Sequence, residues 1–135
     1  MFHISTKGDY GLLLLSTLAE NQAKGKNKIS LREVVAQKKL PLKYLGEIAA
    51  ELKKAGIITS KEGRDGGYSL AKTPSEISLI DVLEALEGKV APVKCCSKEK
   101  TCSIQSTCSV KSTWEEAANM MRDFLKNKSL ADVIN

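Results

Sequence analysis

Apolar residues recur at helical spacing from the beginning of the chain. Ser5 or Thr6 is suited to cap a first helix, whose apolar face is broad enough for a core helix and comprises Tyr10, Leu13, Leu14, Leu15 and Leu18. Further along, Ser30 and Glu33 have the S-x-x-E spacing of a capping box, in which two backbone N–H groups are satisfied reciprocally. This pattern predicts a second, short helix that extends through about Lys39.

A third helix and a β-hairpin are predicted directly after the second helix. Pro41 suits the first position of a helix, and apolar positions then continue at helical spacing until Gly56, namely Leu42, Leu45, Ile48, Ala49 and Leu52. Residues 57–61 and 68–71 predict two strands around the turn GRDGG. The sequence thus predicts a mainly α fold with a small β-hairpin (α+β), a winged helix-turn-helix whose third helix enters the DNA major groove. A generic α+β scaffold is the other interpretation.

The second half of the chain is predicted to hold two more helices. Residues 78–86 have an amphipathic pattern that Gly88 ends, and we expect this helix to pack on the winged unit. After the cysteines, one apolar stripe predicts a long helix; it consists of Trp114, Ala117, Ala118, Met121 and Leu125. Only the tail 129–134 remains to cover this stripe, so the simplest partner is the same helix, or the N-terminal domain, of a second subunit. Packing within its own chain is the other possibility.

Length and composition place these elements in one small protein. With 135 residues, 42% of them hydrophobic, the chain is large enough to close a core. It lacks an apolar run of about 18 residues and a signal-peptide layout, which indicates a cytoplasmic protein that does not enter membranes. We expect four segments: a DNA-binding domain at 1–75, a linking helix at 76–92, a cysteine cluster loop at 93–111, and a dimerisation helix with a tail at 112–135.

Positive charge is concentrated in one stretch. The net charge is +5, and residues 24–43 hold one acid, Glu33, against a set of basic residues: Lys24, Lys26, Lys28, Arg32, Lys38, Lys39 and Lys43. This stretch suits a phosphate backbone, although a solvated, lysine-rich loop explains it equally well. Ser30 and Arg32 lie in it, and we expect both to contact DNA. At the start of the third helix, Lys43, Tyr44 and Glu47 are placed to meet base edges or phosphates, and Arg64 at the hairpin tip suits a narrow minor groove.

Four cysteines lie within residues 95–108. In a reducing compartment they indicate metal ligands or sensors before disulfides. Cys96, Cys102 and Cys108 are separated by five residues each time, and the intervening residues are too polar to form a core, so a bound metal would have to order them. Thiolates favour iron–sulfur clusters and zinc, and three of them leave one coordination position open. Cys95 is a spare, and a thiol–disulfide switch also fits the spacing.

Four motifs in this order, STKGDYGL, LPLKYL, GRDGGY and C-x5-C-x5-C, resemble the IscR and NsrR family of bacterial winged-helix regulators. The resemblance extends from Ile4 to the tail. It implies homodimers that bind double-stranded DNA at two-fold-symmetric operators, with an iron–sulfur cluster controlling affinity. By this resemblance the cluster cysteines are Cys96, Cys102 and Cys108, Lys43 and Tyr44 fall on recognition-helix contact positions, and Gly63 matches the wing glycine.

The sequence departs from IscR-like proteins at several positions. Their fourth ligand is a histidine three residues after the last cysteine, where this chain has Lys111, a residue that is protonated at neutral pH. NsrR-like proteins use an aspartate from the first helix of the other subunit, and Asp9 matches it; its simpler role is to stabilise the helix dipole. The resemblance therefore favours an Asp9-completed 4Fe–4S cluster over a 2Fe–2S cluster. Glu62 and Gly46 replace a wing arginine and a recognition-helix glutamate, so the operator sequence is not implied.

Together these observations predict a transcriptional regulator, with a repressor favoured, whose cluster senses nitric oxide, redox state or iron–sulfur status. One alternative is a winged-helix regulator whose thiols bind zinc or oxidise without a cluster. Another is an iron–sulfur carrier or redox protein. An enzyme is not expected, because the chain has a single histidine, His3, and no phosphate-binding loop between a strand and a helix.

Overall fold

The computed structural model describes residues 4–64, 66–92, 104 and 107–134. Its elements, in chain order, are α1 (Thr6–Ala23), α2 (Leu31–Lys38), α3 (Leu42–Lys54), β1 (Ile58–Lys61), β2 (Gly67–Leu70), the 3-10 helix η1 (Pro74–Glu76), α4 (Leu79–Glu87), α5 (Lys111–Lys126) and α6 (Leu130–Val133). The strands form an antiparallel hairpin in which Ile58 pairs with Leu70 and Lys61 with Gly67. A mainly helical fold with one small hairpin confirms the predicted fold class.

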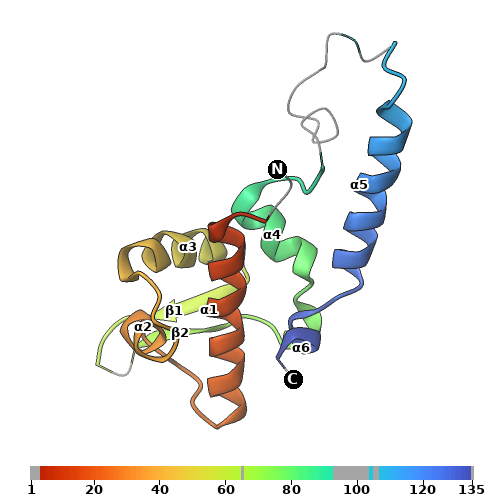
Figure 1. Ribbon diagram of the computed structural model, residues 1–135. Coiled ribbons are helices and arrows are strands. Elements are labelled where there is room, and N and C mark those ends of the chain that lie inside the picture. The colour runs from red at the N-terminus through yellow and green to blue at the C-terminus, as the bar shows by residue number, and fades with distance from the viewer. Residues whose placement is uncertain (1–3, 65, 93–103, 105–106, 135) are drawn as a thin grey trace.

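Helix α1 is the central element of the fold (Figure 1). Of the two predicted capping residues, Ser5 is the one used, since its hydroxyl accepts a hydrogen bond from the Gly8 N–H. Leucines of α1 form the middle of the core, where Leu14 and Leu15 are fully buried. The buried Asn21 ties α1 to α2, because its side-chain amide donates to the Gln37 side-chain oxygen at 3.2 Å.

Helices α2 and α3 form the predicted helix-turn-helix. The capping box of α2 is present: the Ser30 N–H donates to a Glu33 carboxylate oxygen at 2.7 Å, and the Glu33 N–H donates to the Ser30 hydroxyl at 3.2 Å. Lys39 ends α2 in the left-handed conformation, with φ 55°. Pro41 has an extended backbone and is the N-cap residue of α3. The helix therefore begins one residue later than predicted, at Leu42.

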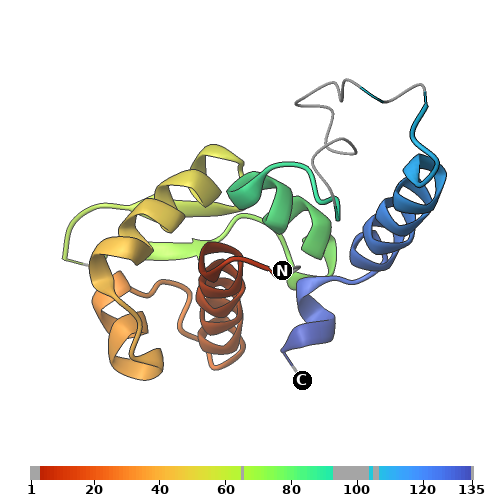
Figure 2. The same cartoon turned by 45° about the horizontal axis from the view of Figure 1, so that its top comes forward.

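The hairpin is anchored to the body of the protein at both ends. Ile29, just before α2, exchanges two backbone hydrogen bonds with Tyr68, which extends the hairpin by one bridge. Strand β1 starts at Ile58 and not at the predicted Ile57, because the Ile57 N–H donates to the Leu52 carbonyl and closes the end of α3. The loop between the strands projects away from the helices (Figure 2).

The apolar stripe of α5 was expected to pack either on a second subunit or within its own chain. Helix α5 lies beside α4, on the opposite side of the molecule from the hairpin tip (Figures 1 and 2). Ala118 is buried and Arg122 is ion-paired to Glu84 of α4, so part of α5 packs on its own chain. Of the other predicted stripe residues, Ala117, Met121 and Leu125 are half-buried and Trp114 is 39% exposed. The most exposed apolar side chains of α5, Met120 at 67% and Phe124 at 61%, lie outside the predicted stripe.

The tail does not cover α5. Its Leu130 is fully buried in the core, which also holds residues of α1 and α4, and the Leu130 N–H donates to the Ile77 carbonyl at 2.8 Å. A bridge between Ser78 and Ser129 fixes the tail to the start of α4. None of the helices in the described part of the chain combines the length and the apolar character needed to span a bilayer.

Candidate nucleic-acid interface and cysteine segment

Helix α3 has one buried face and one outward face. Four apolar side chains hold it against the core: Leu45, Ile48, Ala49 and Leu52. Because a helix turns by about 100° per residue, the remaining positions share the outward face. The exposed residues of α3 are Leu42, Lys43, Glu47, Ala50, Lys53 and Lys54. The predicted DNA contact Lys43 is therefore presented to solvent at the start of the helix.

Tyr44, the second predicted contact on α3, has a different setting. Its ring is half-buried and meets the ring of Tyr10 on α1 edge-on, with 5.7 Å between ring centroids and 76° between ring planes. The residue thus fixes α3 against α1. A contact of Tyr44 with DNA stays a prediction.

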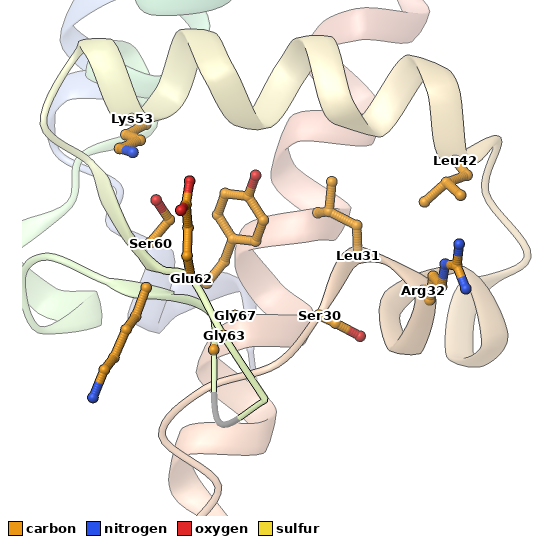
Figure 3. A pocket seen from close by; sticks show the side chains of 12 residues that line it. Ser30, Leu31, Arg32, Leu42, Lys53, Ser60, Glu62, Gly63 and Gly67 are labelled. Carbon is orange, nitrogen blue, oxygen red and sulfur yellow. The ribbon is translucent and has the colours of Figure 1, made fainter.

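A groove of about 580 Å³ runs between the start of α2, helix α3 and the hairpin. In Figure 3, Arg32 and Leu42 lie at one end of it, and Lys53, Ser60 and Glu62 gather at the other. The predicted contacts Ser30, Arg32 and Gly63 all line this groove. Lys53 and Lys61 line it too, although the sequence analysis did not single them out; the signal for Lys53 was its position on the polar face of α3.

The capping box of α2 engages the backbone N–H and the hydroxyl of Ser30, and its Glu33 also pairs with Lys26. Lys26 bonds to the Glu33 carboxylate, and this bond, followed by the Ser30 N–H, lowers the pKa of Glu33 below its ordinary value of 4.5. Lys38 pairs with Glu20 at 3.5 Å. Two of the basic residues between 24 and 43 are thus partly neutralised by acids, whereas Arg32 is exposed.

The hairpin loop depends on glycine. Gly63 has φ 106° and Gly67 has φ 148°, conformations that side chains disfavour. A Cβ on Gly67 would also come within 2.9 Å of the Ile29 backbone. Both predicted contacts at this loop, Gly63 and Arg64, are exposed. Glu62 takes the groove-side position that the resemblance assigns to an arginine.

The first turn of α1 touches both α3 and the end of α4. Lys7 forms an ion pair with Glu51 of α3, with 2.6 Å between Nζ and Oε1. On the other side, the Ser5 N–H donates to the Glu87 carboxylate at 2.9 Å, and the Ser5 hydroxyl bonds to the same oxygen. Glu87 is the last residue of α4, so these bonds tie the end of α4 to the turn of α1 that carries Asp9.

Three of the four cysteines, Cys95, Cys96 and Cys102, lie outside the described residues. Cys108 is described: it precedes α5 and has a free, partly exposed thiol. Asp9 is exposed in the first turn of α1. In the part of the chain that the structure describes, no three metal-binding side chains converge. The ligand set Cys96, Cys102, Cys108 and Asp9 therefore stays a prediction.

Lys111, at the position of the IscR-like histidine, is the first residue of α5. Its ammonium pairs with Glu115 one turn along the helix, with 3.6 Å between Nζ and Oε1. This is the behaviour of a charged surface lysine.

Comparison with known proteins gives a consistent result. The model of the Rrf2 family, described as an iron-dependent transcriptional regulator, matches residues 4–135. Protein rrf2 of Nitratidesulfovibrio vulgaris (strain Hildenborough) is 33% identical over 97% of this chain and 86% of its own length. Among solved structures, CymR, the global cysteine regulator of B. subtilis, aligns with a TM-score of 0.78 at 29% identity, covering 99% of this chain and 97% of its own. IscR of T. potens aligns with a TM-score of 0.76 at 31% identity, covering 98% and 86%.

Proposed function

The chain belongs to the Rrf2 family of transcriptional regulators, and from this premise we propose that it binds operator DNA as a homodimer whose affinity is set by its cysteine segment. The observation that carries the DNA-binding part is the groove between α3 and the hairpin, with Arg32, Lys53 and Lys61 along it. Cationic side chains on a protruding helix and hairpin suit two neighbouring stretches of phosphate backbone. Its relatives are regulators and not enzymes, which also argues against a carrier or redox protein.

Salt-dependent binding to duplex DNA tests this part. Fluorescence anisotropy would follow binding of the full chain, at increasing salt, to a labelled duplex selected from a random-sequence library. Lys43→Ala and Arg64→Ala should each weaken binding and reduce the slope of log affinity against log salt by about 1. The matched control is Lys126→Ala, at the far end of α5, which should leave both quantities unchanged. Equal losses in all three variants would contradict the assignment of the interface.

Homodimer formation is supported by the uncovered face of α5. Exposed apolar residues gather along this helix, namely Val110, Trp114, Met120 and Phe124. Exposed apolar surface of this kind is unfavourable in water, and a second copy of the chain would bury it. A two-fold dimer would also present two α3 helices to a two-fold-symmetric operator. Phe124→Lys should therefore shift the sedimentation of the protein toward monomer and weaken DNA binding. Lys126→Ala again serves as the control on the same helix.

For the sensing part, we propose that Cys96, Cys102 and Cys108 bind an iron–sulfur cluster with Asp9 of the second subunit, 4Fe–4S in preference to 2Fe–2S. The donor set suits it: thiolates are ligands that such clusters favour, and the Asp9 carboxylate is exposed. When bound, the cluster would supply a centre sensitive to nitric oxide, oxygen or iron supply. Asp9 lies on the turn of α1 that contacts α3 through Lys7, so restraint of Asp9 would bear directly on α3.

A regulator that uses its thiols without a cluster is the second candidate. The similarity to CymR, described as a cysteine regulator, favours it. Iron, sulfide and zinc would be counted in anaerobically purified protein, with Asp9→Asn compared to Asp123→Asn on α5. Iron with sulfide, lost in Asp9→Asn alone, supports the cluster and its fourth ligand. Zinc without sulfide, or no metal together with oxidant-sensitive DNA binding, supports the second candidate.

A further inference from the structure

Glu47 is the one acidic side chain on the outward face of α3. The other acid of this helix, Glu51, is half-buried and paired with Lys7 on the opposite flank. Glu47 is exposed, and the ion pairs among the described residues do not include it. Its neighbours on the outward face are lysines near both ends of the helix, Lys43, Lys53 and Lys54.

A carboxylate in this position is at odds with phosphate contact. Lysines near the ends of α3 attract the DNA backbone, whereas a carboxylate beside a phosphate is repelled and has no proton to donate. In the major groove, the donors that a carboxylate can accept from are the exocyclic amino groups of cytosine and adenine, and pairing with the cytosine N4 amino group is the established preference of Glu. The charge of Glu47 therefore suits contact with base edges in the DNA major groove and not with the phosphates that border it.

The surroundings of Glu47 leave this approach open. A Cβ added to Gly46 would meet nothing within 4 Å, and Ala50, one turn further, is exposed and short. The middle of the outward face thus carries no long side chain except Glu47. Because the side chains around the centre of its outward face are short, α3 can approach the base pairs closely enough for Glu47 to reach an amino group.

We propose that Glu47 determines operator specificity by accepting a hydrogen bond from the N4 amino group of a cytosine in each half-site. The inference rests on the proposed function, in which α3 enters the major groove. It also predicts the consequence of a conservative change. Glutamine has the same length and pairs bidentately with adenine N6 and N7, so Glu47→Gln should exchange cytosine for adenine at the same operator position.

Selection from a library of random-sequence duplexes tests this directly with the full-length protein. The wild-type pool should be enriched in cytosine at one position of each half-site, and the Glu47→Gln pool in adenine at that position. Glu47→Ala should lose the preference there while the rest of the motif persists. Glu116→Gln, an exposed change on α5, is the charge-matched control and should select the wild-type motif. Unfolding curves of the variants verify that each is folded.

Affinities for the selected duplexes give the magnitude. Replacing the cytosine by adenine should weaken wild-type binding by roughly 5- to 150-fold and should strengthen binding of Glu47→Gln, because one base contact is worth about 1–3 kcal/mol. An identical motif for wild type and Glu47→Gln would overturn the inference and leave the proposed function intact. A wild-type chain that selects no motif would overturn the proposed operator recognition itself.

Discussion

Lys7 in the first turn of α1 forms an ion pair with Glu51 of α3, with 2.6 Å between the ammonium nitrogen and the carboxylate oxygen. The pair joins the turn that carries Asp9 to the helix that presents Lys43 and Glu47. Both side chains are partly exposed, 28% for Lys7 and 40% for Glu51, so water and salt screen the pair. The pair therefore contributes little to the stability of the fold.

We therefore expect a small energetic coupling between these two residues. Lys7→Met and Glu51→Gln should each lower the free energy of unfolding by less than about 1 kcal/mol, with a coupling of about 0.2–1 kcal/mol in the double-mutant cycle. Urea unfolding at low and high salt measures both, and the coupling should shrink at high salt. The more distant pair Lys38–Glu20, at 3.5 Å, provides the comparison and should couple less. A salt-independent coupling of several kcal/mol would contradict this view.

Leu130 connects the C-terminal tail to the hydrophobic core. Because its side chain is fully buried in the core, Leu130→Ala should lower the free energy of unfolding by about 2–5 kcal/mol through lost burial and a residual cavity. Val133→Ala, in the same short helix but 47% exposed, should cost much less. Thermal or urea unfolding distinguishes the two. Equal, small effects would mean that the tail does not belong to the core.

Two glycines should respond to alanine in opposite directions. Gly67→Ala should destabilise the protein by more than about 1 kcal/mol, because φ is 148° and the new Cβ would press on the Ile29 backbone. Gly46→Ala should stabilise it by about 0.5–1 kcal/mol, since Gly46 lies within α3 and a Cβ there meets nothing. Differential scanning calorimetry measures both changes. Stabilisation by Gly67→Ala would exclude the described hairpin geometry.

The cap of α2 should make stability depend on pH in the acid range. The bonds from Lys26 and the Ser30 N–H hold the pKa of Glu33 below its ordinary value of 4.5. A lowered folded-state pKa contributes stability that is present above about 4.5 and is lost as the pH falls through the folded-state value. The stability difference between wild type and Glu33→Gln should therefore be largest at neutral pH and narrow in acid. Urea unfolding across this range measures it.

Removing the other half of the cap provides the control for this pH effect. Ser30→Ala should cost about 0.5–2 kcal/mol at neutral pH, because the Glu33 N–H loses its acceptor. The Ser30 hydroxyl does not titrate in this pH range. The loss of unfolding free energy in Ser30→Ala should therefore persist in acid more than the loss in Glu33→Gln. A pH-independent difference for Glu33→Gln would show that the carboxylate does not act through its charge.

Local features of the fold were predictable because neighbouring residues decide them. The capping box of Ser30 and Glu33 depends on residues three apart, and the glycines of the hairpin loop are required by the turn itself. Boundaries were less predictable. Pro41 lies outside α3 and Ile57 outside β1, because single backbone bonds at these junctions depend on how the elements meet.

The candidate interface was likewise predictable only in part. Apolar periodicity predicted the third helix with Lys43 near its start, and the GRDGG turn placed Arg64 at the hairpin tip. The pattern along the chain is sufficient for both. It did not identify Lys61 as part of the groove, since the groove exists only when the hairpin lies beside α2 and α3. Nor did it predict that Tyr44 packs on Tyr10, a residue of another helix.

The amino-acid pattern is sufficient to specify the helices, the hairpin, the outward cations and the existence of an apolar stripe on α5, because these follow from spacing along the chain. It does not specify what covers an apolar face. Tertiary packing decided that Leu130 joins the main core and that Ala118 is buried, while Met120 and Phe124 remain exposed. Burial is non-directional, so an amphipathic pattern requires a partner without saying which surface provides it.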